Sequence, residues 1–311
     1  LVDPVKVAQS FVEAAQKSDK PVLACMMGSY SVQEARDLLH RNHLPMTDYP
    51  EQTGVIFGAL RQYSEIRQLH EITNRFAVKK DHAQADNIFR SSSAKVWGEH
   101  VTRPLLNAYG VSLVEGELAA DLSAAQKAAA RLGYPVVVKV ASQDVLHKSD
   151  FGAIAVNIGN DQEMDSAYQR ILGNVKKHTQ NAAIEGVLVE KMAPKGLEVI
   201  IGMKRDPGFG PLMMFGMGGV FVELFKDVAF RVAPLTYADA QEMVAETKAY
   251  KLLCGWRGSQ ESDIEAIIEN ILRLSELATD FPQIQEIEIN PLLVLPKGQG
   301  ALALDCRMIL A

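Results

Sequence analysis

Hydrophobic and polar positions alternate along the chain in a way that predicts two α/β segments. In residues 1–66, apolar residues at helical spacing predict a helix over 5–16 and a second one that ends near Asn42. A short apolar run over 21–27 predicts a buried strand between them, and a short strand at 43–46 leads to a third helix that begins at Pro50. This order is typical of a doubly wound parallel sheet, of which two strands form only a part.

The remainder of the chain predicts a linker and a larger α/β domain. Apolar periodicity lapses over residues 67–94, which are rich in charged residues and serine, so we expect an interdomain linker there. From residue 95 to 311 helices and strands follow one another in no simple repeat. The predicted helices cover 94–109, 123–132, 165–178, 237–253 and 262–280, and the predicted strands include 136–140, 153–158, 186–192, 198–203, 212–215, 284–289 and 301–304.

Composition excludes several classes of protein. Hydrophobic residues make up 48% and charged residues 23% of the chain, as in soluble globular proteins, and no apolar run approaches the roughly 20 residues of a membrane span. The formal net charge of -6 disfavours nucleic-acid binding. Cys25, Cys254 and Cys306 lie far apart, which predicts reduced cysteines in a cytoplasmic protein rather than a zinc site. Because residue 1 is leucine and starts close to a helix, we expect a fragment or a processed piece.

One charged residue interrupts the most hydrophobic predicted strand. Lys139 lies within the run Val136–Val140, which follows a helix stop at Gly133 and Pro135. A polar loop with the sequence His-Lys-Ser-Asp, residues 147–150, comes after the strand. A lysine in a buried strand beside a histidine-bearing loop suggests the binding of an anion, although a strand-end lysine that reaches solvent remains the alternative.

Oxygen ligands gather near the end of the chain. Glu288 and Asn290 lie two apart on a predicted strand, so their side chains point to the same face. Asp305 on a neighbouring strand completes a set of oxygen donors of the kind that Mg²⁺ prefers, with nucleotide phosphates and water as further ligands. Together with a phosphate-binding lysine, this set predicts an ATP-grasp fold.

At these motifs the chain resembles the nucleotide-binding part of ADP-forming acyl-CoA synthetases, the acetate–CoA ligases related to succinyl-CoA synthetase. The resemblance covers about residues 94–310 and implies an ATP-grasp domain with subdomains over 95–190 and 191–311, preceded by the end of a flavodoxin-like CoA-ligase domain over 1–66. It rests on these motifs in this order: GYPVVVK, HKSD, GMGGVFVE, AYKLL, EINPL and ALD.

The resemblance implies a role for each of thirteen residues. Lys139 would hold the nucleotide phosphates, Glu190 and Met192 would lie at the adenine hinge, and Glu198 would lie near the ribose. His147 would relay a phosphoryl group, since neutral imidazole is a competent acceptor. The other candidates are the glycine-rich segment and its neighbours (Gly216, Gly218, Gly219, Glu223), the metal ligands (Glu288, Asn290, Asp305) and a catalytic arginine (Arg231).

Several of these residues have ordinary structural alternatives. Glycine-rich runs are also typical of hairpin turns, Glu190 and Glu198 are plausible surface carboxylates, and Arg231 fits a surface ion pair about as well as a phosphoryl contact. His147 also fits a loop residue that only positions its neighbours.

The function implied by the resemblance is acyl-CoA + ADP + phosphate ⇌ carboxylate + CoA + ATP, through phosphohistidine. ATP or ADP and Mg²⁺ would be the cofactors, and CoA-binding and phosphohistidine domains, absent from this sequence, would be the partners, in an oligomer. Two rivals remain: a regulatory acyl-CoA-sensing module of a lysine acetyltransferase, and a carboxylate–amine ligase of the ATP-grasp class. The histidine loop argues against the second, because such ligases pass phosphate directly to the carboxylate.

Overall fold

The computed structural model describes residues 3–28, 30–71, 77–92, 94–145, 148, 151–179, 182–218 and 227–311. The chain divides into two units, Leu1–Thr73 and Asn74–Ala311, and each is described by itself. No helix of these described residues is long and apolar enough to cross a membrane.

Unit 1 is a small α/β segment with a two-stranded parallel sheet. Its elements are α1 (Pro4–Gln16), β1 (Ala24–Cys25), the 3₁₀ helix η1 (Tyr30–Val32), α2 (Gln33–Arg41), β2 (Met46–Thr47) and α3 (Pro50–Glu71). The side chain of Asp3 caps α1 by accepting a hydrogen bond from the Val5 amide at 3.0 Å. The order of elements is the one that the sequence predicts, with shorter strands than expected.

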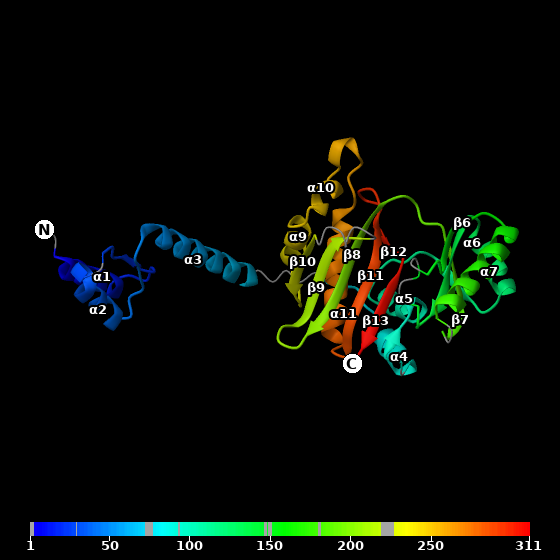
Figure 1. Cartoon of the computed structure of the whole chain (residues 1–311), viewed down its shortest axis with the longest axis horizontal. Coiled ribbons are helices and arrows are strands. Elements are labelled where there is room, and N and C mark those ends of the chain that lie inside the picture. Colours follow the sequence, from blue (N-terminus) through cyan, green and yellow to red (C-terminus); the bar gives the residue numbers. More distant parts are fainter. Residues whose placement is uncertain are drawn as a thin grey trace. The chain divides into compact units, whose positions relative to one another are not determined.

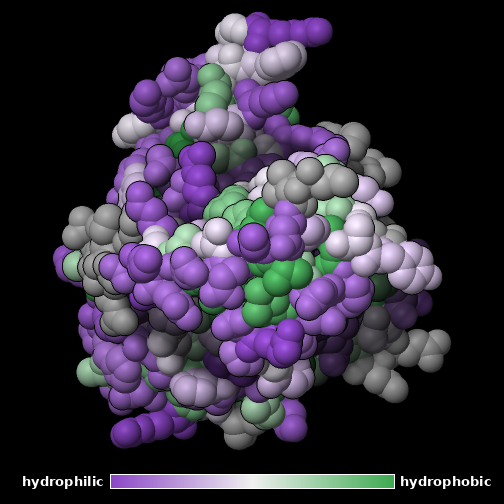
Figure 2. Space-filling model, turned by 90° about the vertical axis from the view of Figure 1, so that its left-hand side faces the viewer, coloured by the Kyte–Doolittle hydropathy of each residue, from purple (hydrophilic) through white to green (hydrophobic). Residues whose placement is uncertain are grey.

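The face of the molecule drawn in Figure 2 is mostly polar, with apolar residues gathered in places. Figure 2 shows a largely hydrophilic face with hydrophobic residues near its middle. In unit 1, α3 carries exposed apolar side chains, among them Val55 at 73%, Tyr63 at 61% and Ile66 at 46% exposure. Such exposure is unusual for a helix that faces only water, because contiguous apolar patches mark contacts with other surfaces.

Unit 2 contains two antiparallel sheets, which appear as separate layers in Figure 1. The small sheet has the strand order β4-β7-β5-β6, and α6 and α7 pack against it. Its elements are β4 (Gly116–Ala119), α6 (Leu122–Leu132), β5 (Val136–Ser142), β6 (Ile154–Ile158), α7 (Asp161–His178) and β7 (Ile184–Lys191). Alternate residues of β5, Val136, Val138 and Val140, are buried in the core formed with these helices.

In the described part of the chain the large sheet has seven strands, in the order β10-β9-β8-β11-β13-β3 with β12 paired to β11. The strands are β3 (Val96–Trp97), β8 (Leu197–Asp206), β9 (Gly210–Met217), β10 (Val228–Val232), β11 (Ile284–Val294), β12 (Ala301–Ala303) and β13 (Cys306–Leu310). The hairpin predicted over 198–215 is confirmed as β8 and β9, with Met203 opposite Met213. The other elements of this part are α4 (His82–Ser91), α5 (Glu99–Ala108), α9 (Tyr237–Ala245), α10 (Ala249–Leu253), the 3₁₀ helix η2 (Trp256–Gly258) and α11 (Ile264–Asp280).

Two features of unit 2 differ from the sequence-based expectation. The range 67–94, expected as a linker, contains α4, whose Ala85 is fully buried in the core of the large sheet. β3 pairs with β13 at the edge of the large sheet, and α5 packs against that sheet. Trp97 of β3 and Leu105 of α5 are both buried in its core. The chain thus begins unit 2 on the large sheet, crosses to the small sheet and returns, whereas the predicted subdomain 95–190 is continuous.

Candidate active site

A cavity of about 700 Å³ lies between the two sheets of unit 2. Both sheets contribute to its lining, as does the first turn of α5. Seven of the residues singled out in the sequence line it, although they are as much as 166 positions apart, from 139 to 305: Lys139, Glu190, Met192, Glu198, Glu288, Asn290 and Asp305. The fold therefore brings the predicted nucleotide and metal residues to one place.

Strand alternation places Lys139 on the cavity side of β5. Because successive side chains of a strand point to opposite faces, the neighbours Val138 and Val140 enter the helix-covered core and Lys139 enters the cavity. Its side chain is only 5% exposed. A lysine this deeply buried requires anionic partners.

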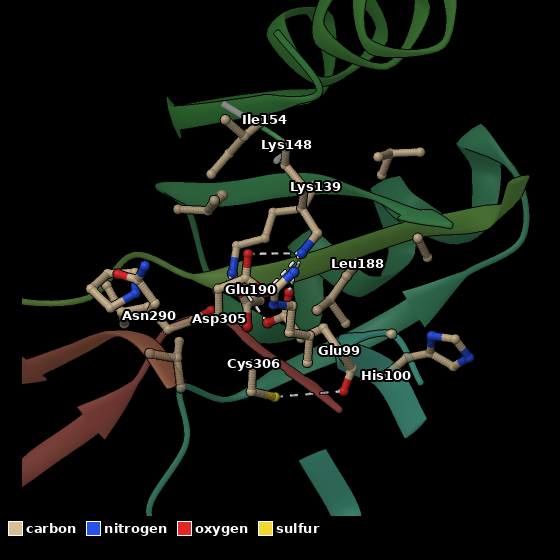
Figure 3. A pocket seen from close by; sticks show the side chains of 18 of the residues that line it. Glu99, His100, Lys139, Lys148, Ile154, Leu188, Glu190, Asn290, Asp305 and Cys306 are labelled. Atoms are coloured by element: carbon tan, nitrogen blue, oxygen red, sulfur yellow. Dashed lines mark hydrogen bonds and ion pairs between the residues drawn. The ribbon is translucent and has the colours of Figure 1, made fainter. Parts of the chain in front are cut away.

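Among the described residues, Lys139 has two carboxylate partners and one carbonyl partner. Its Nζ lies 2.5 Å from Glu190 Oε2 and 3.2 Å from Glu99 Oε1, and it also donates a hydrogen bond to the carbonyl oxygen of Leu304. Figure 3 shows the lysine head pointing into this group of oxygens. Glu99 and Leu304 come from the large-sheet part, so Lys139 joins the two halves of unit 2.

Lys148 makes a second crossing between the two halves. Its Nζ lies 2.7 Å and 2.8 Å from the two carboxylate oxygens of Asp305, which follows β12, and 3.3 Å from Glu99 Oε2. Lys148 is adjacent to the predicted phosphoryl acceptor, His147, which lies outside the described residues. Lys148 therefore contacts one residue of the predicted metal site, Asp305.

Sequence reasoning missed two residues of the cluster, Glu99 and Arg103 on α5. Arg103 Nη1 lies 3.2 Å from Glu99 Oε1, and the guanidinium also pairs with Glu190 and donates to the carbonyl oxygen of Val114. A signal was available, because Glu99 lies three and six positions before the buried Thr102 and Leu105. A charged residue on the buried stripe of a helix indicates a specific partner.

Electrostatics in the cluster follow from burial and pairing. Burial opposes ionisation of Glu99, but the positive charges of Lys139, Lys148 and Arg103 outweigh it and lower the pKa of this carboxyl. Burial and the nearby charge of Glu99 raise the pKa of Asp305. Burial likewise raises the pKa of the Glu190 carboxyl. It also raises the pKa of the thiol of Cys306, which follows Asp305 in sequence. Burial disfavours the cation of Lys139, yet the charges of Glu99 and Glu190 raise its pKa.

Two residues of the predicted metal site, Glu288 and Asn290, lie side by side on β11. Asn290 Nδ2 donates a hydrogen bond to Glu288 Oε1 at 3.0 Å, which confirms that the two side chains share a face. Arg307 of β13 holds the other oxygen of Glu288 at 2.8 Å. The backbone amide of Asn290 donates to the carbonyl oxygen of Asp305 at 3.0 Å, so the three predicted metal residues are neighbours.

The predicted hinge residues connect the two sheets. Glu190 is 3% exposed and belongs to the charged cluster, whereas Met192 and Glu198 line the cavity from exposed positions at the end of β7 and the start of β8. The segment between these strands is the direct connection from the small sheet to the large one. A nucleotide base bound here would contact both halves.

The glycines of the predicted phosphate loop are needed for close strand packing. A Cβ on Gly216 would lie 2.8 Å from the Asp227 carbonyl oxygen, and one on Gly218 would lie 2.9 Å from backbone atoms of Glu198 and Val199. Gly216 is not among the residues that line the cavity. Gly219 and Glu223 lie outside the described residues.

We expect Gly216→Ala to lower the free energy of unfolding by about 1–3 kcal/mol, because the added methyl meets backbone that cannot move independently. Urea unfolding measures this change. Gly173→Ala in α7 is the matched control, since a Cβ there meets nothing within 4 Å, and it should leave stability unchanged or raise it slightly. Loss of nucleotide binding at unchanged stability would instead assign Gly216 to phosphate recognition.

Arg231 lies apart from the charged cluster. On β10 it forms a two-pronged ion pair with Glu246, with Nη1 3.0 Å from Oε2 and Nη2 2.5 Å from Oε1. It is not a lining residue of the cavity in the described part of the chain. The surface ion pair that the sequence leaves open is thus present, and a catalytic role for Arg231 stays a prediction.

Comparison with known proteins agrees with this geometry. Residues 89–310 match the family described as ATP-grasp domain. The beta subunit of acetate–CoA ligase [ADP-forming] I from Pyrococcus furiosus is 45% identical over 212 residues, which cover 68% of this chain and 90% of that subunit. The chain belongs to the ADP-forming acetate–CoA ligases. Its ATP-grasp fold, predicted from the motifs, is confirmed.

Longer and structurally characterised members of the family are also similar to the chain. Acetate–CoA ligase [ADP-forming] I of Archaeoglobus fulgidus is 40% identical over 312 residues, 99% of this chain and 44% of that protein, so the chain spans less than half of this relative. The "dinucleotide forming" acetyl-coenzyme A synthetase 1 of Ca. Korarchaeum cryptofilum was solved in complex with coenzyme A, Ca-AMPCP and HgCl+. That structure has a TM-score of 0.70 and 43% identity, and the match covers 73% of this chain and all of the solved one.

Proposed function

We propose that this chain is the nucleotide-binding part of an ADP-forming acyl-CoA synthetase, which interconverts acyl-CoA, ADP and phosphate with a carboxylate, CoA and ATP. The observation that supports this most is the cavity between the sheets, where Lys139 and Lys148 face carboxylates at the position expected for a metal–nucleotide complex. Family membership and the nucleotide analogue named in the complex of a relative add support.

In this proposal the cavity binds ADP or ATP along its length. The adenine lies at the connection that carries Met192, the ribose lies near Glu198, and the phosphates reach Lys139. Glu190, which the resemblance assigns to the adenine hinge, lies instead at the phosphate end, 2.5 Å from Lys139 Nζ. The cation of Lys139 stabilises the phosphate charge, and its burial strengthens that interaction because little water screens it. Apolar side chains from both sheets, such as Val137, Leu188 and Leu293, line the same cavity and suit the base.

Mg²⁺ fits the oxygen donors at the other end of the cavity. Glu288, Asn290 and Asp305 all line it, and carboxylate and amide oxygens are the ligands that this ion takes in nucleotide sites. Glu288 and Asp305 are held by Arg307 and Lys148, so these cations must share or release their carboxylates when a metal binds. The bound ion would neutralise charge on the phosphates during transfer.

His147 is the proposed phosphoryl carrier of this half-reaction. Transfer from ATP breaks the bond between the γ-phosphorus and its bridging oxygen, forms a phosphorus–nitrogen bond to the imidazole and leaves ADP. In the ATP-forming direction an oxygen of the ADP β-phosphate attacks the phosphohistidine and the neutral ring leaves. Lys148, adjacent to His147 in sequence, contacts Asp305 of the proposed metal site.

The proposed partners are CoA-binding and phosphohistidine domains, on a separate subunit or elsewhere in a longer chain, in a cytoplasmic oligomer. The exposed apolar side chains of α3 provide a surface for such a partner, and the sheet in the described residues of unit 1 has two strands. We propose that residues 1–66 belong to a flavodoxin-like CoA-ligase domain and residues 95–311 to the ATP-grasp domain.

Reconstitution tests the whole proposal. The chain is mixed with a polypeptide that carries the CoA-binding and phosphohistidine domains, and ATP formation from acetyl-CoA, ADP, phosphate and Mg²⁺ is measured. We expect ATP only when both polypeptides are present. Calorimetry of the chain alone should show ADP binding; binding without ATP formation in the reconstituted enzyme would favour a regulatory nucleotide-sensing module.

A further inference from the structure

Both lysines of the cavity already contact protein oxygens. An ammonium group has three N–H donors. Lys139 faces three acceptors, on Glu99, Glu190 and the Leu304 carbonyl, and Lys148 faces both oxygens of Asp305 and one of Glu99. A phosphate that binds Lys139 must therefore displace one of these oxygens or share a donor with it. At Lys148 it replaces a looser ionic contact, because Glu99 Oε2 accepts no hydrogen bond from the described residues.

Glu99 is the partner whose contacts are weakest at both lysines. Its Oε1 lies 3.2 Å from Lys139 Nζ, against 2.5 Å for Glu190, and its Oε2 lies 3.3 Å from Lys148 Nζ, against 2.7 Å for Asp305. One carboxylate thus bridges the two ammonium groups (Figure 3), which is the arrangement that a phosphate oxygen pair would adopt.

Glu99 also has a cationic partner, Arg103, that can remain paired with it after the lysines bind a phosphate. Arg103, one helical turn further along α5, lies 3.2 Å from Glu99 Oε1. The Glu99 side chain is 4% exposed and sits in the first turn of α5, so it cannot swing out to solvent. Its negative charge consequently stays near the cavity after a phosphate has entered.

We propose that Glu99 is an affinity-setting residue of the nucleotide site: it occupies the phosphate-binding positions of Lys139 and Lys148 until nucleotide displaces it onto Arg103. This inference rests on the proposed function. Among the described residues, three carboxylates face three cations in the cluster, so their charges balance without nucleotide: Glu99, Glu190 and Asp305 against Lys139, Lys148 and Arg103. Nucleotide binding must overcome both the competing contacts and the repulsion from Glu99.

The proposal predicts that removing the charge of Glu99 strengthens binding of ADP without metal. Glu99→Gln keeps the shape of the side chain and leaves one positive charge in excess beside the incoming phosphates. We expect the Kd for ADP in the presence of a chelator to fall about tenfold, as is reasonable for one close charge in a shielded site. Calorimetry on the full chain measures it, and thermal unfolding shows whether the variant is folded.

Two further variants make the test specific. Glu185→Gln is the matched control, because Glu185 pairs across the same two halves with His100, the neighbour of Glu99 on α5, at 2.8 Å, and it should leave the Kd unchanged. Glu99→Asp retains the charge but draws the carboxylate back from both lysines, so ADP should bind more tightly by a smaller factor. This second variant also covers the case in which Glu99→Gln does not fold.

The outcomes separate this proposal from a purely structural role and from the proposed function. If Glu99 only supported the fold, its folded variants would bind ADP more weakly or equally well, and either result would overturn the proposal. If the unmodified chain bound no ADP with or without Mg²⁺, the proposed function itself would fail. Tighter binding in both Glu99 variants, with Glu185→Gln unchanged, is the result that we expect.

Discussion

Lys139→Met should reduce the affinity of the chain for ADP by about a hundredfold. The change removes a cation that faces the cavity and leaves the charges of Glu99 and Glu190 there to repel phosphate. Truncating one member of a buried charge pair typically costs about 2–5 kcal/mol in binding, and much of that cost comes from the charge left behind. Methionine preserves the length of the aliphatic stem, so the packing of β5 should change little.

Calorimetry with ADP and Mg²⁺ measures this loss of affinity. The stability of the variant must be measured as well, because an unfolded variant would also fail to bind. Breaking a buried ion pair by removing one partner destabilises a protein by about 3–5 kcal/mol, so thermal unfolding should show a lower Tm for Lys139→Met. Lys176→Met, on the exposed last turn of α7, is a control for the loss of one positive charge. Unchanged ADP affinity in folded Lys139→Met would contradict the placement of phosphates at this lysine.

Local patterns were sufficient to predict the strands and the residues that alternate on them. Strand period places Lys139 opposite the core residues of β5, and it places Glu288 beside Asn290 on β11. The hairpin of β8 and β9 followed from its turn chemistry. In each case the determining interactions lie within a few residues, so periodicity alone carries the information.

Contacts between distant segments were not predictable in the same way. Glu99 meets Lys139 across forty positions, and Lys148 meets Asp305 across 157, so only the packing of the two halves brings them together. The same holds for α4, whose polar residues suggest a linker while Ala85 and Phe89 pack on the large core. Tertiary burial outweighs local polarity there, because a few apolar residues on one face are enough to dock a short helix.

The difference between local patterns and long-range contacts matters for the motif at residues 147–150, where sequence and structure give different information. The sequence supplies the candidate acceptor, His147, and the structure supplies its neighbour Lys148, held at 2.7 Å from Asp305. If Asp305 helps to hold a metal–nucleotide complex, Lys148 lies close to that complex, and His147 is its neighbour in sequence. Proximity of this kind converts a slow bimolecular transfer into a fast one within the complex.

We therefore expect His147→Asn to abolish self-phosphorylation of the chain. With γ-labelled ATP and Mg²⁺, the unmodified chain should acquire label that acid removes and alkali does not, as a phosphorus–nitrogen bond to imidazole requires. Asparagine has no ring nitrogen to attack phosphorus, so label should fall by at least about a hundredfold. ADP binding should persist, because Lys139 and the rest of the cavity lining are unchanged.

His178→Asn is the matched control for this experiment. His178 is the last residue of α7 and is exposed. Its ring centroid lies 5.3 Å from that of Phe151, and it does not line the cavity. Its variant should be labelled like the unmodified chain.

The outcomes for His147→Asn are distinct. Label that survives in this variant would assign the acceptor role to another residue. Loss of label together with loss of ADP binding would mean that His147 supports the site rather than carries the phosphoryl group. Only selective loss of label, with binding intact, assigns the chemistry to His147 and leaves Lys139 and Glu99 to govern how tightly the nucleotide is held.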